Sequence, residues 1–324
     1  MSKQFVIVPI GGIGDWLVCT PAIKALKEKH PDHKIIVYKN ERSYKNTLAV
    51  FANNPDVHAV RILNWITLLR YPRDLFMSLC DVYNRMFRPR KVEWFRMNKY
   101  RYFEMHFQHI APTIIYQKSV KEIIPEILGV KAKDTRIQLF TTVDEDRHAI
   151  EMLAPYKYPV IMHIHSNSSD NHHWDMRNWA ALVKELPEYS FIQVGSPKEP
   201  YVEGAIDWRG KTSLREVFCL LKHAASFVGV DSSMSHATNA FNTPGVVLFG
   251  DSSPVYWGHD NNINIYKKLP CSPCYYILAG GACPYGTQCM KEITVEDVKQ
   301  ALVTQVSSRS KREHIPVKAA LSLA

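Results

Sequence analysis

Residues 226–250, "SFVGVDSSMSHATNAFNTPGVVLFG", decide the fold class of this protein. The apolar runs at 226–230 and 245–250 are typical of buried strands, and residues 235–241 between them suit a helix. A strand, a helix and a second strand in this order predict part of a parallel α/β sheet.

The junction between the first of these strands and the helix also predicts a binding site. Asp231, Ser232 and Ser233 fall in the first helical turn, where free backbone N–H groups, hydroxyls and the positive end of the helix dipole attract anions. Ser232 and Ser233, with His236 one turn further on, are candidates to hold a phosphate at the carboxyl end of a strand. The alternative is that Asp231 or Ser232 only caps the helix.

The same alternation continues on both sides of this stretch. In the second half, we expect strands at 160–166 and 190–196, and helices at 176–187 and 213–224. In the first half, we expect strands at 5–10, 34–40 and 57–63, and helices at 21–30 and 43–54. Two successive α/β series predict two Rossmann-like domains that face a central cleft. We expect domains at 1–155 and 156–305, and a basic tail at 306–324.

Residues 64–110 interrupt this pattern and are rich in arginine, lysine and aromatic residues. One interpretation is an amphipathic helical cover whose aromatic side chains face the core. The other is a surface for an anionic or amphipathic substrate, because cations beside aromatic rings suit phosphates and sugars.

Composition limits the setting and the kind of partner. A chain of 324 residues with 46% hydrophobic residues can form two domains, and its net charge of +9 favours an anionic partner. The sequence contains neither an apolar run of about 18 residues nor a signal-peptide pattern. Three of the seven cysteines lie in apolar segments, which is typical of a reducing compartment. We therefore expect a cytoplasmic protein.

The glycine-rich stretch 8–22, "VPIGGIGDWLVCTPA", follows the first expected strand. Its glycines do not fit G-x-G-x-x-G, and the second strand ends in basic and polar residues, which argues against a nicotinamide-dependent oxidoreductase. Asp15 directly follows the last of these glycines. By itself, it could be a helix cap or a carboxylate with a role in catalysis.

Cys271, Cys274, Cys283 and Cys289 form a C-x2-C-x8-C-x5-C pattern in a loop at 271–289. This spacing is typical of a tetrahedral thiolate site for structural zinc or iron. The alternatives are reduced cysteines that pack the loop, or one disulfide. A nucleic-acid-binding protein with a zinc knuckle would explain these cysteines and the charge, but it would leave both α/β halves without a purpose.

Histidines also cluster at positions 163, 165, 172 and 173. We do not expect a metal site there, because no carboxylate stands at matching spacing. A contribution to the cleft from the end of a strand is the preferred interpretation.

Several motifs together resemble those of glycosyltransferase family 9, the heptosyltransferases. They are "GGIGDWLVCTPAIKALKEKHPDHKI", "NNPDVHAV", "NHHWDMRNWAAL", "GKTSLREVFCLLKHAASFVGVDSSMSHATNAFNTPGVVLFG" and the cysteine loop. The resemblance implies a GT-B fold whose C-terminal domain binds a nucleotide sugar. It implies inverting transfer of heptose from ADP-heptose, without a metal in the chemistry, and no nucleic-acid partner. The acceptor that the resemblance implies is lipopolysaccharide core, with peripheral contact at the inner membrane. The alternative is an autotransporter protein, as in some relatives.

The resemblance also implies roles for individual residues. Asp15 falls on the family's general base, and Gly12 and Gly14 lie in the loop that the acceptor approaches. The residues implied in donor binding are Asp231, Ser232, Ser233 and His236 for the diphosphate, Glu199 for the ribose, and His172. Two positions depart from the family: His172 or His173 stands where a lysine is common, and Ser233 replaces a usual glycine.

Overall fold

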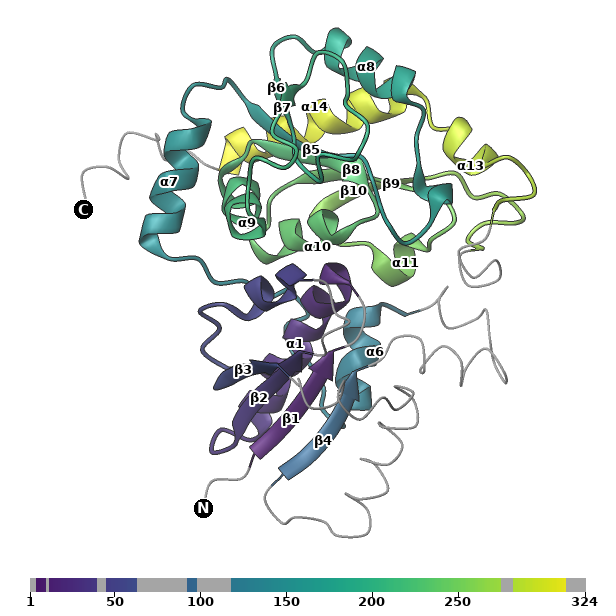
Figure 1. Ribbon diagram of the computed structural model, residues 1–324. Coiled ribbons are helices and arrows are strands. Elements are labelled where there is room, and N and C mark those ends of the chain that lie inside the picture. Colours follow the sequence, from purple (N-terminus) through teal and green to yellow (C-terminus); the bar gives the residue numbers. More distant parts are fainter. Residues whose placement is uncertain are drawn as a thin grey trace. The chain divides into compact units, whose positions relative to one another are not determined.

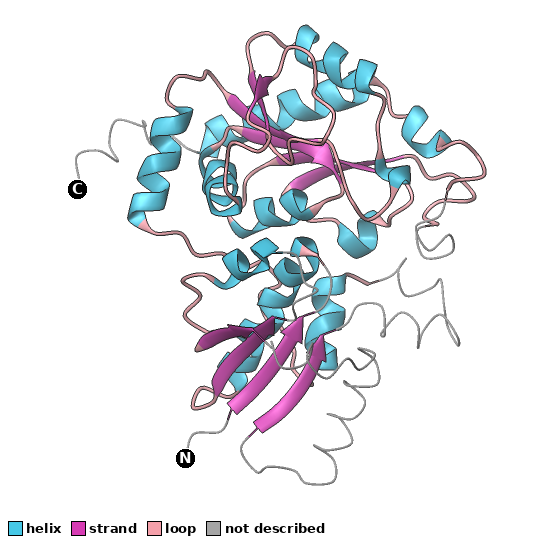
Figure 2. Ribbon diagram, in the orientation of Figure 1, coloured by secondary structure: helices cyan, strands magenta, loops and turns pink. Residues whose placement is uncertain are grey.

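The computed structural model describes residues 4–9, 12–39, 45–62, 92–97, 118–274 and 282–312. The chain divides into two compact units, Met1–Thr141 and Thr142–Ala324. In each unit the strands form a parallel sheet with helices packed against it (Figures 1 and 2).

The first unit contains a four-stranded sheet in the order β3-β2-β1-β4. The strands are β1 (Gln4–Pro9), β2 (Lys34–Lys39), β3 (Ala59–Ile62) and β4 (Val92–Met97). The helices are α1 (Ile13–Lys29), the 3-10 helix η1 (Lys45–Phe51) and α6 (Val120–Ile127). All strand pairs of this sheet are parallel.

Strand β4 corrects one expectation. It lies within the basic segment 64–110, for which a helical cover was one interpretation, and pairs with β1 from Gln4↔Val92 to Pro9↔Met97. The rest of that segment lies outside the described residues.

Helix α1 begins at Ile13, earlier than the expected start at Pro21. Pro21 has no N–H, so it cannot donate to the carbonyl of Leu17. The hydroxyl of Thr20 donates to that carbonyl instead, at 2.7 Å, and accepts the N–H of Gln138 at 2.8 Å. The helix therefore continues through the proline and is tied to the end of the unit.

The second unit contains a six-stranded parallel sheet in the order β10-β9-β8-β5-β6-β7. The strands are β5 (Pro159–His163), β6 (Ser190–Gln193), β7 (Ile206–Asp207), β8 (Ser226–Val230), β9 (Gly245–Phe249) and β10 (Asn262–Tyr266). In chain order this is the doubly wound Rossmann sheet. Its topological switch point lies between β5 and β8, where such folds bind ligands.

Helices and turns complete the second unit. They are α7 (Val143–Leu153), η2 (Asp170–His172), α8 (Met176–Glu185), α9 (Leu214–His223), α10 (Ser233–Ala240), α11 (Pro254–Trp257), α13 (Gln288–Lys291) and α14 (Val295–Arg312). Helix α14 continues past residue 306, where we expected the basic tail to start, and residues 313–324 lie outside the described part.

The division between the units lies before α7, not near residue 155. Helix α7 belongs to the second unit because its acidic first turn is bound by α9. Glu145 pairs with Arg215, and Asp146 accepts from Lys222 at 2.6 Å and from His223 at 3.0 Å. The charged residues of this segment therefore serve a helix–helix contact.

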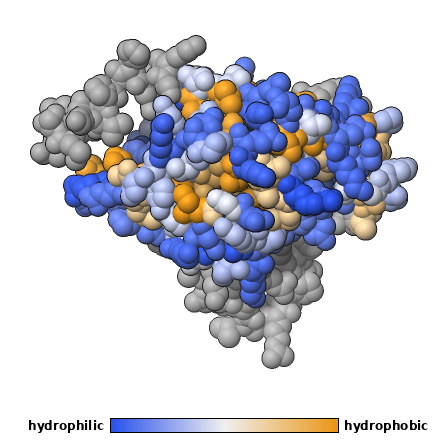
Figure 3. All heavy atoms as spheres, turned by 90° about the horizontal axis from the view of Figure 1, so that it is seen from above, coloured by the Kyte–Doolittle hydropathy of each residue, from blue (hydrophilic) through white to orange (hydrophobic). Residues whose placement is uncertain are grey.

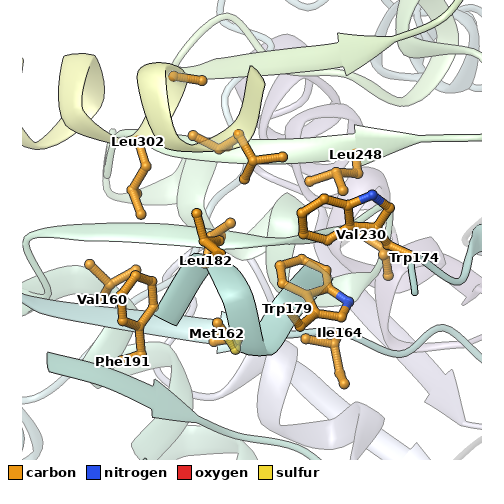
Figure 4. Packing of buried hydrophobic residues seen from close by; sticks show 14 of the residues in the cluster. Val160, Met162, Ile164, Trp174, Trp179, Leu182, Phe191, Val230, Leu248 and Leu302 are labelled. Atoms are coloured by element: carbon orange, nitrogen blue, oxygen red, sulfur yellow. The ribbon is translucent and has the colours of Figure 1, made fainter. Parts of the chain in front are cut away.

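The core of the second unit surrounds two tryptophans (Figure 4). The rings of Trp174 and Trp179 meet edge to face with centroids 4.8 Å apart, and Trp174 Nε1 donates to the carbonyl of Ile293 at 2.9 Å. Trp174 directly follows His173, so this packing fixes the loop that leads from β5 into α8.

On the face drawn in Figure 3, the described residues mix hydrophilic and hydrophobic side chains, with the hydrophobic ones in small groups. Among these residues, every helix is too short or too polar to cross a bilayer.

Candidate active site

The expected phosphate turn lies between β8 and α10. Ser232 takes the N-cap position with an extended backbone, and α10 begins at Ser233. Asp231 and Ser232 are buried, whereas Ser233 is half-buried. Ser235 Oγ donates to the carbonyl of Ser232 at 2.7 Å and tightens the first turn. The turn thus joins the carboxyl end of a central strand to a helix N-terminus, a geometry suited to an anion.

Strand β5 brings a histidine to this turn. His163 is the last residue of β5 and pairs with Gly229 of β8 in the sheet. Its Nδ1 lies 2.9 Å from Ser232 Oγ, and its Nε2 lies 3.7 Å from Glu199 Oε2. The switch point of the sheet therefore brings together Ser232 and Glu199, two residues implied in donor binding, with His163 between them.

Glu199 owes its position to Gly195. Gly195 has φ +136°, and a Cβ at this position would lie 2.2 Å from Glu199 Oε2. The other carboxylate oxygen accepts the N–H of Ser196 at 2.9 Å. Only glycine leaves room for the carboxylate to fold back against this loop, where its side chain is 9% exposed.

The electrostatic surroundings favour a neutral His163. Burial lowers the pKa of His163; the carboxylate of Glu199 opposes this effect, and His165 adds to it. His165 in turn stacks on His173, with ring centroids 4.7 Å apart. Burial likewise lowers the pKa of His173.

His236 lies buried on α10, one turn after Ser232. Its Nδ1 is 2.8 Å from His259 Nε2, and its ring centroid is 5.6 Å from that of Trp257. Since Nδ1 is engaged by His259, a contact from His236 to a phosphate would have to come from Nε2.

His172 has a partner that the sequence analysis did not identify. Its Nε2 lies 2.5 Å from Asp251 Oδ1, and both side chains are buried. Asp251 also accepts from Ser169 Oγ at 2.7 Å and from Asn171 Nδ2 at 3.2 Å. Burial raises the pKa of Asp251, but the hydrogen bond from His172 and those from its other two donors outweigh this and hold the pKa below its usual value.

This pair gives His172 a structural role in holding the loop that precedes α8. The signal for Asp251 was present in the sequence, since "LFGDSS" places a carboxylate at the carboxyl end of a buried strand. Nothing in the sequence indicated which residue it would face.

Asp15 lies in the first turn of α1, in the first unit. Its Oδ2 accepts the N–H of Gly12 at 2.8 Å, so the carboxylate caps the helix. Gly12 is the N-cap residue with φ −84°, and Gly14 already lies inside the helix. Gly11 lies outside the described residues. The glycine-rich stretch therefore enters a helix directly, with the carboxylate at its positive end.

The cysteine loop is attached to the neighbourhood of Asp251. The N–H of Cys274 donates to the carbonyl of Asp251 at 2.8 Å, and that of Cys283 donates to Asn171 Oδ1 at 3.1 Å. Burial, Asp251 and the other thiols raise the pKa of Cys274 to about 12. Burial also raises that of Cys289, to about 11.

The expected metal site is not confirmed. All four cysteines of the loop are free. Within the described ranges, which omit 275–281, no group of three or more histidine, cysteine or acidic residues is placed to hold a metal ion.

Comparison with known proteins agrees with this architecture. The model of glycosyltransferase family 9 (heptosyltransferase) matches residues 119–278. Lipopolysaccharide heptosyltransferase 3 of Escherichia coli (strain K12) is 24% identical, over 79% of this chain and 87% of its own length. Lipopolysaccharide heptosyltransferase 1 of Salmonella typhimurium is 27% identical, over 39% of this chain and 42% of its own.

Solved structures show the same fold. The ADP-heptose lipopolysaccharide heptosyltransferase II of E. coli has a TM-score of 0.68 at 14% identity, and the match covers 95% of this chain and all of that one. The iron-containing dodecameric glycosyltransferase TibC from enterotoxigenic E. coli also has a TM-score of 0.68, at 16% identity, and the match covers 95% and 76%. These matches confirm the expected fold class. The chain therefore belongs to glycosyltransferase family 9 and is a glycosyltransferase.

Proposed function

We propose that this glycosyltransferase moves a heptose from ADP-heptose, with inversion, to a hydroxyl of lipopolysaccharide core. The observation that carries the proposal is that His163, at the switch point of the second sheet, lies beside both Ser232 and Glu199. The curated relatives are lipopolysaccharide heptosyltransferases, and a solved neighbour is described as bound to ADP-D-beta-D-heptose.

The donor binds with its diphosphate at the N-terminus of α10. Backbone N–H groups of this turn, the hydroxyls of Ser232 and Ser233, and His236 Nε2 bind the charge that grows on the leaving diphosphate. Glu199 accepts from a ribose hydroxyl. No residue of this group needs a metal for its role, because hydrogen-bond donors and the helix dipole face the negative charge.

Asp15 acts as the general base. The acceptor hydroxyl attacks the anomeric carbon of the heptose, the bond from that carbon to the diphosphate oxygen breaks, and ADP leaves with the electron pair. Asp15 accepts the proton of the attacking hydroxyl. This carboxylate can take the role because it is only half-buried at the start of α1.

The substrate test is a turnover assay of the full chain with ADP-, GDP- and UDP-activated sugars and purified lipopolysaccharide core. We expect release of ADP from ADP-heptose and a core mass increased by one heptose. Transfer to a protein but not to core would show that the acceptor is a protein and not a glycolipid. No release from any of these donors would contradict the proposal. A glycolipid acceptor also implies peripheral contact with the inner membrane.

We also propose that Cys271, Cys274, Cys283 and Cys289 hold a structural zinc or iron ion. Four thiols within one loop supply the donor set for such an ion. Metal analysis of protein purified without chelator tests this. Cys274→Ser should lose the metal, whereas Cys219→Ser, a control outside the loop, should keep it. Less than about a tenth of an equivalent of zinc or iron contradicts it.

A further inference from the structure

The ring of His163 lies between the two residues to which the proposed function assigns donor binding. Nδ1 is 2.9 Å from Ser232 Oγ, and Nε2 is 3.7 Å from Glu199 Oε2. His163 is only 8% exposed. Ser232 is the proposed contact to the diphosphate and Glu199 the proposed contact to the ribose, so the inference below rests on the proposed function.

The number of hydrogens in this arrangement restricts what Ser232 can do. A neutral imidazole carries one N–H, and a carboxylate can only accept. The hydrogen therefore sits on Nε2, facing Glu199, and Nδ1 accepts the hydroxyl hydrogen of Ser232. In this state the Ser232 hydroxyl is committed to His163, and it cannot donate to a phosphate oxygen, which also only accepts.

The charges around the ring decide its protonation. Burial lowers the pKa of His163 in the free protein, so the ring is neutral near neutral pH. Two titratable groups act on it: Glu199, from the loop after β6, favours the imidazolium, and His165, two residues further along its own chain segment, opposes it. A diphosphate at the start of α10 would add negative charge on the Ser232 side and favour the imidazolium further.

We propose that His163 takes up one proton from solvent when the diphosphate of the donor binds beside Ser232. The proton is held at Nδ1, which then donates to Ser232 Oγ, while Nε2–H continues to face Glu199. The Ser232 hydroxyl turns to the phosphate. His163 is thus a positioning residue, since it acts on the donor through Ser232 and Glu199, and the step itself makes or breaks no bond of the sugar.

Calorimetry of ADP-heptose binding to the full chain tests the proposal. Titrations at one pH in two buffers of different ionisation enthalpy give the number of protons taken up. Both phosphates of this ligand are esterified, so it contributes no phosphate proton near neutral pH. We expect uptake of up to about one proton. As pH rises between the pKa values of His163 in the free and the bound protein, the affinity should fall by up to about tenfold per pH unit.

His163→Asn separates this role from simple packing. The asparagine side chain can donate to Ser232 but does not titrate, so we expect binding without proton uptake and with little pH dependence. His58→Asn, at an exposed histidine of the first unit, serves as the control and keeps the uptake. Binding by the unchanged protein without uptake, or equal uptake by His163→Asn, would overturn the proposal.

Two further outcomes are informative. If His163→Asn does not fold, a histidine NMR titration of the unchanged protein replaces it. A histidine whose pKa rises when ADP-heptose is added supports the proposal, and no such rise contradicts it. If ADP-heptose does not bind at all, the proposed function fails. If it binds without a proton, only the inference about His163 fails.

Discussion

At the scale of single residues, two carboxylates lie in different surroundings. Asp15 is half-buried and accepts one backbone N–H at the start of α1. Asp251 is 1% exposed and is bound by His172, Ser169 and Asn171. Asp15 is the residue proposed to accept a proton from the substrate, whereas Asp251 holds two loops together.

The role of Asp15 predicts a selective loss of catalysis. Asp15→Asn can still accept the Gly12 N–H but cannot take a proton, so we expect kcat to fall by about 10²–10⁴ while ADP-heptose affinity stays unchanged. Steady-state kinetics and calorimetry measure the two quantities. Asp32→Asn, at an exposed position of the same unit, is the control and should behave like the unchanged protein. Near-normal turnover of Asp15→Asn would remove Asp15 from the mechanism.

Gly195 predicts a selective loss of donor affinity. In Gly195→Ala the new Cβ would displace the Glu199 carboxylate, so we expect a dissociation constant for ADP-heptose raised by about tenfold or more, from loss of about 1.5–3 kcal/mol of a charged hydrogen bond. Gly204→Ala is the matched control: Gly204 also has a positive φ, +85°, but its Cβ would meet Val183 instead. Equal losses of affinity in both variants would show that backbone strain, not Glu199, is responsible.

At the scale of elements, α7 shows how local signals are reinforced by packing. Thr142 and Glu145 form a capping box at its start, and Glu145 also accepts from Arg215 of α9. The hydrogen bond from Arg215 lowers the pKa of Glu145 in the folded chain, against the opposing effect of burial. One side chain thus caps its own helix and joins it to the next.

This contact predicts a pH-dependent contribution to stability. A carboxyl group whose pKa is lowered by folding stabilises the fold above its unfolded pKa, and this contribution disappears as pH falls through the folded pKa. We expect Glu145→Gln to lower the free energy of unfolding by about 1 kcal/mol at pH 7 and by much less near pH 3. Denaturant unfolding at the two pH values measures this. The same difference at both would exclude an electrostatic origin.

At the scale of the whole molecule, the described residues form two α/β units built on parallel sheets. The switch point of the second sheet carries the candidate donor site, while Asp15 belongs to the first unit. Donor binding is thus proposed for the second unit and proton transfer for a residue of the first. The two functions can therefore be tested independently.

Donor binding should therefore stabilise the chain without help from the catalytic base. At a ligand concentration of about 100 times the dissociation constant, we expect ADP-heptose to stabilise the folded state by about 2.7 kcal/mol, visible as a higher Tm. Asp15→Asn should show the same increase and Ser232→Ala a smaller one. An increase lost in Asp15→Asn but kept in Ser232→Ala would contradict the assignment of the donor site.

The sequence by itself determined what depends on neighbours along the chain. The alternating strands and helices, the strand-to-helix turn at 231–233 and the α/β class follow from hydrophobic periodicity and helix capping, which act over a few residues. The same local rules misjudged β4, because a strand in a basic, aromatic segment becomes recognisable only once it pairs with β1. They also placed the start of α1 too late, because the hydroxyl of Thr20 offsets the hydrogen bond that Pro21 cannot make.

Only the tertiary structure decided which side chains meet. His163 reaches Ser232 because the strand order places β5 beside β8, although the two residues are 69 positions apart. His172 meets Asp251 for the same kind of reason, across the loops that follow β5 and β9. Periodicity along the chain reveals that strands exist, but their order in a sheet is set by packing of the whole unit. The candidate site, built where strand ends converge, depends on that order.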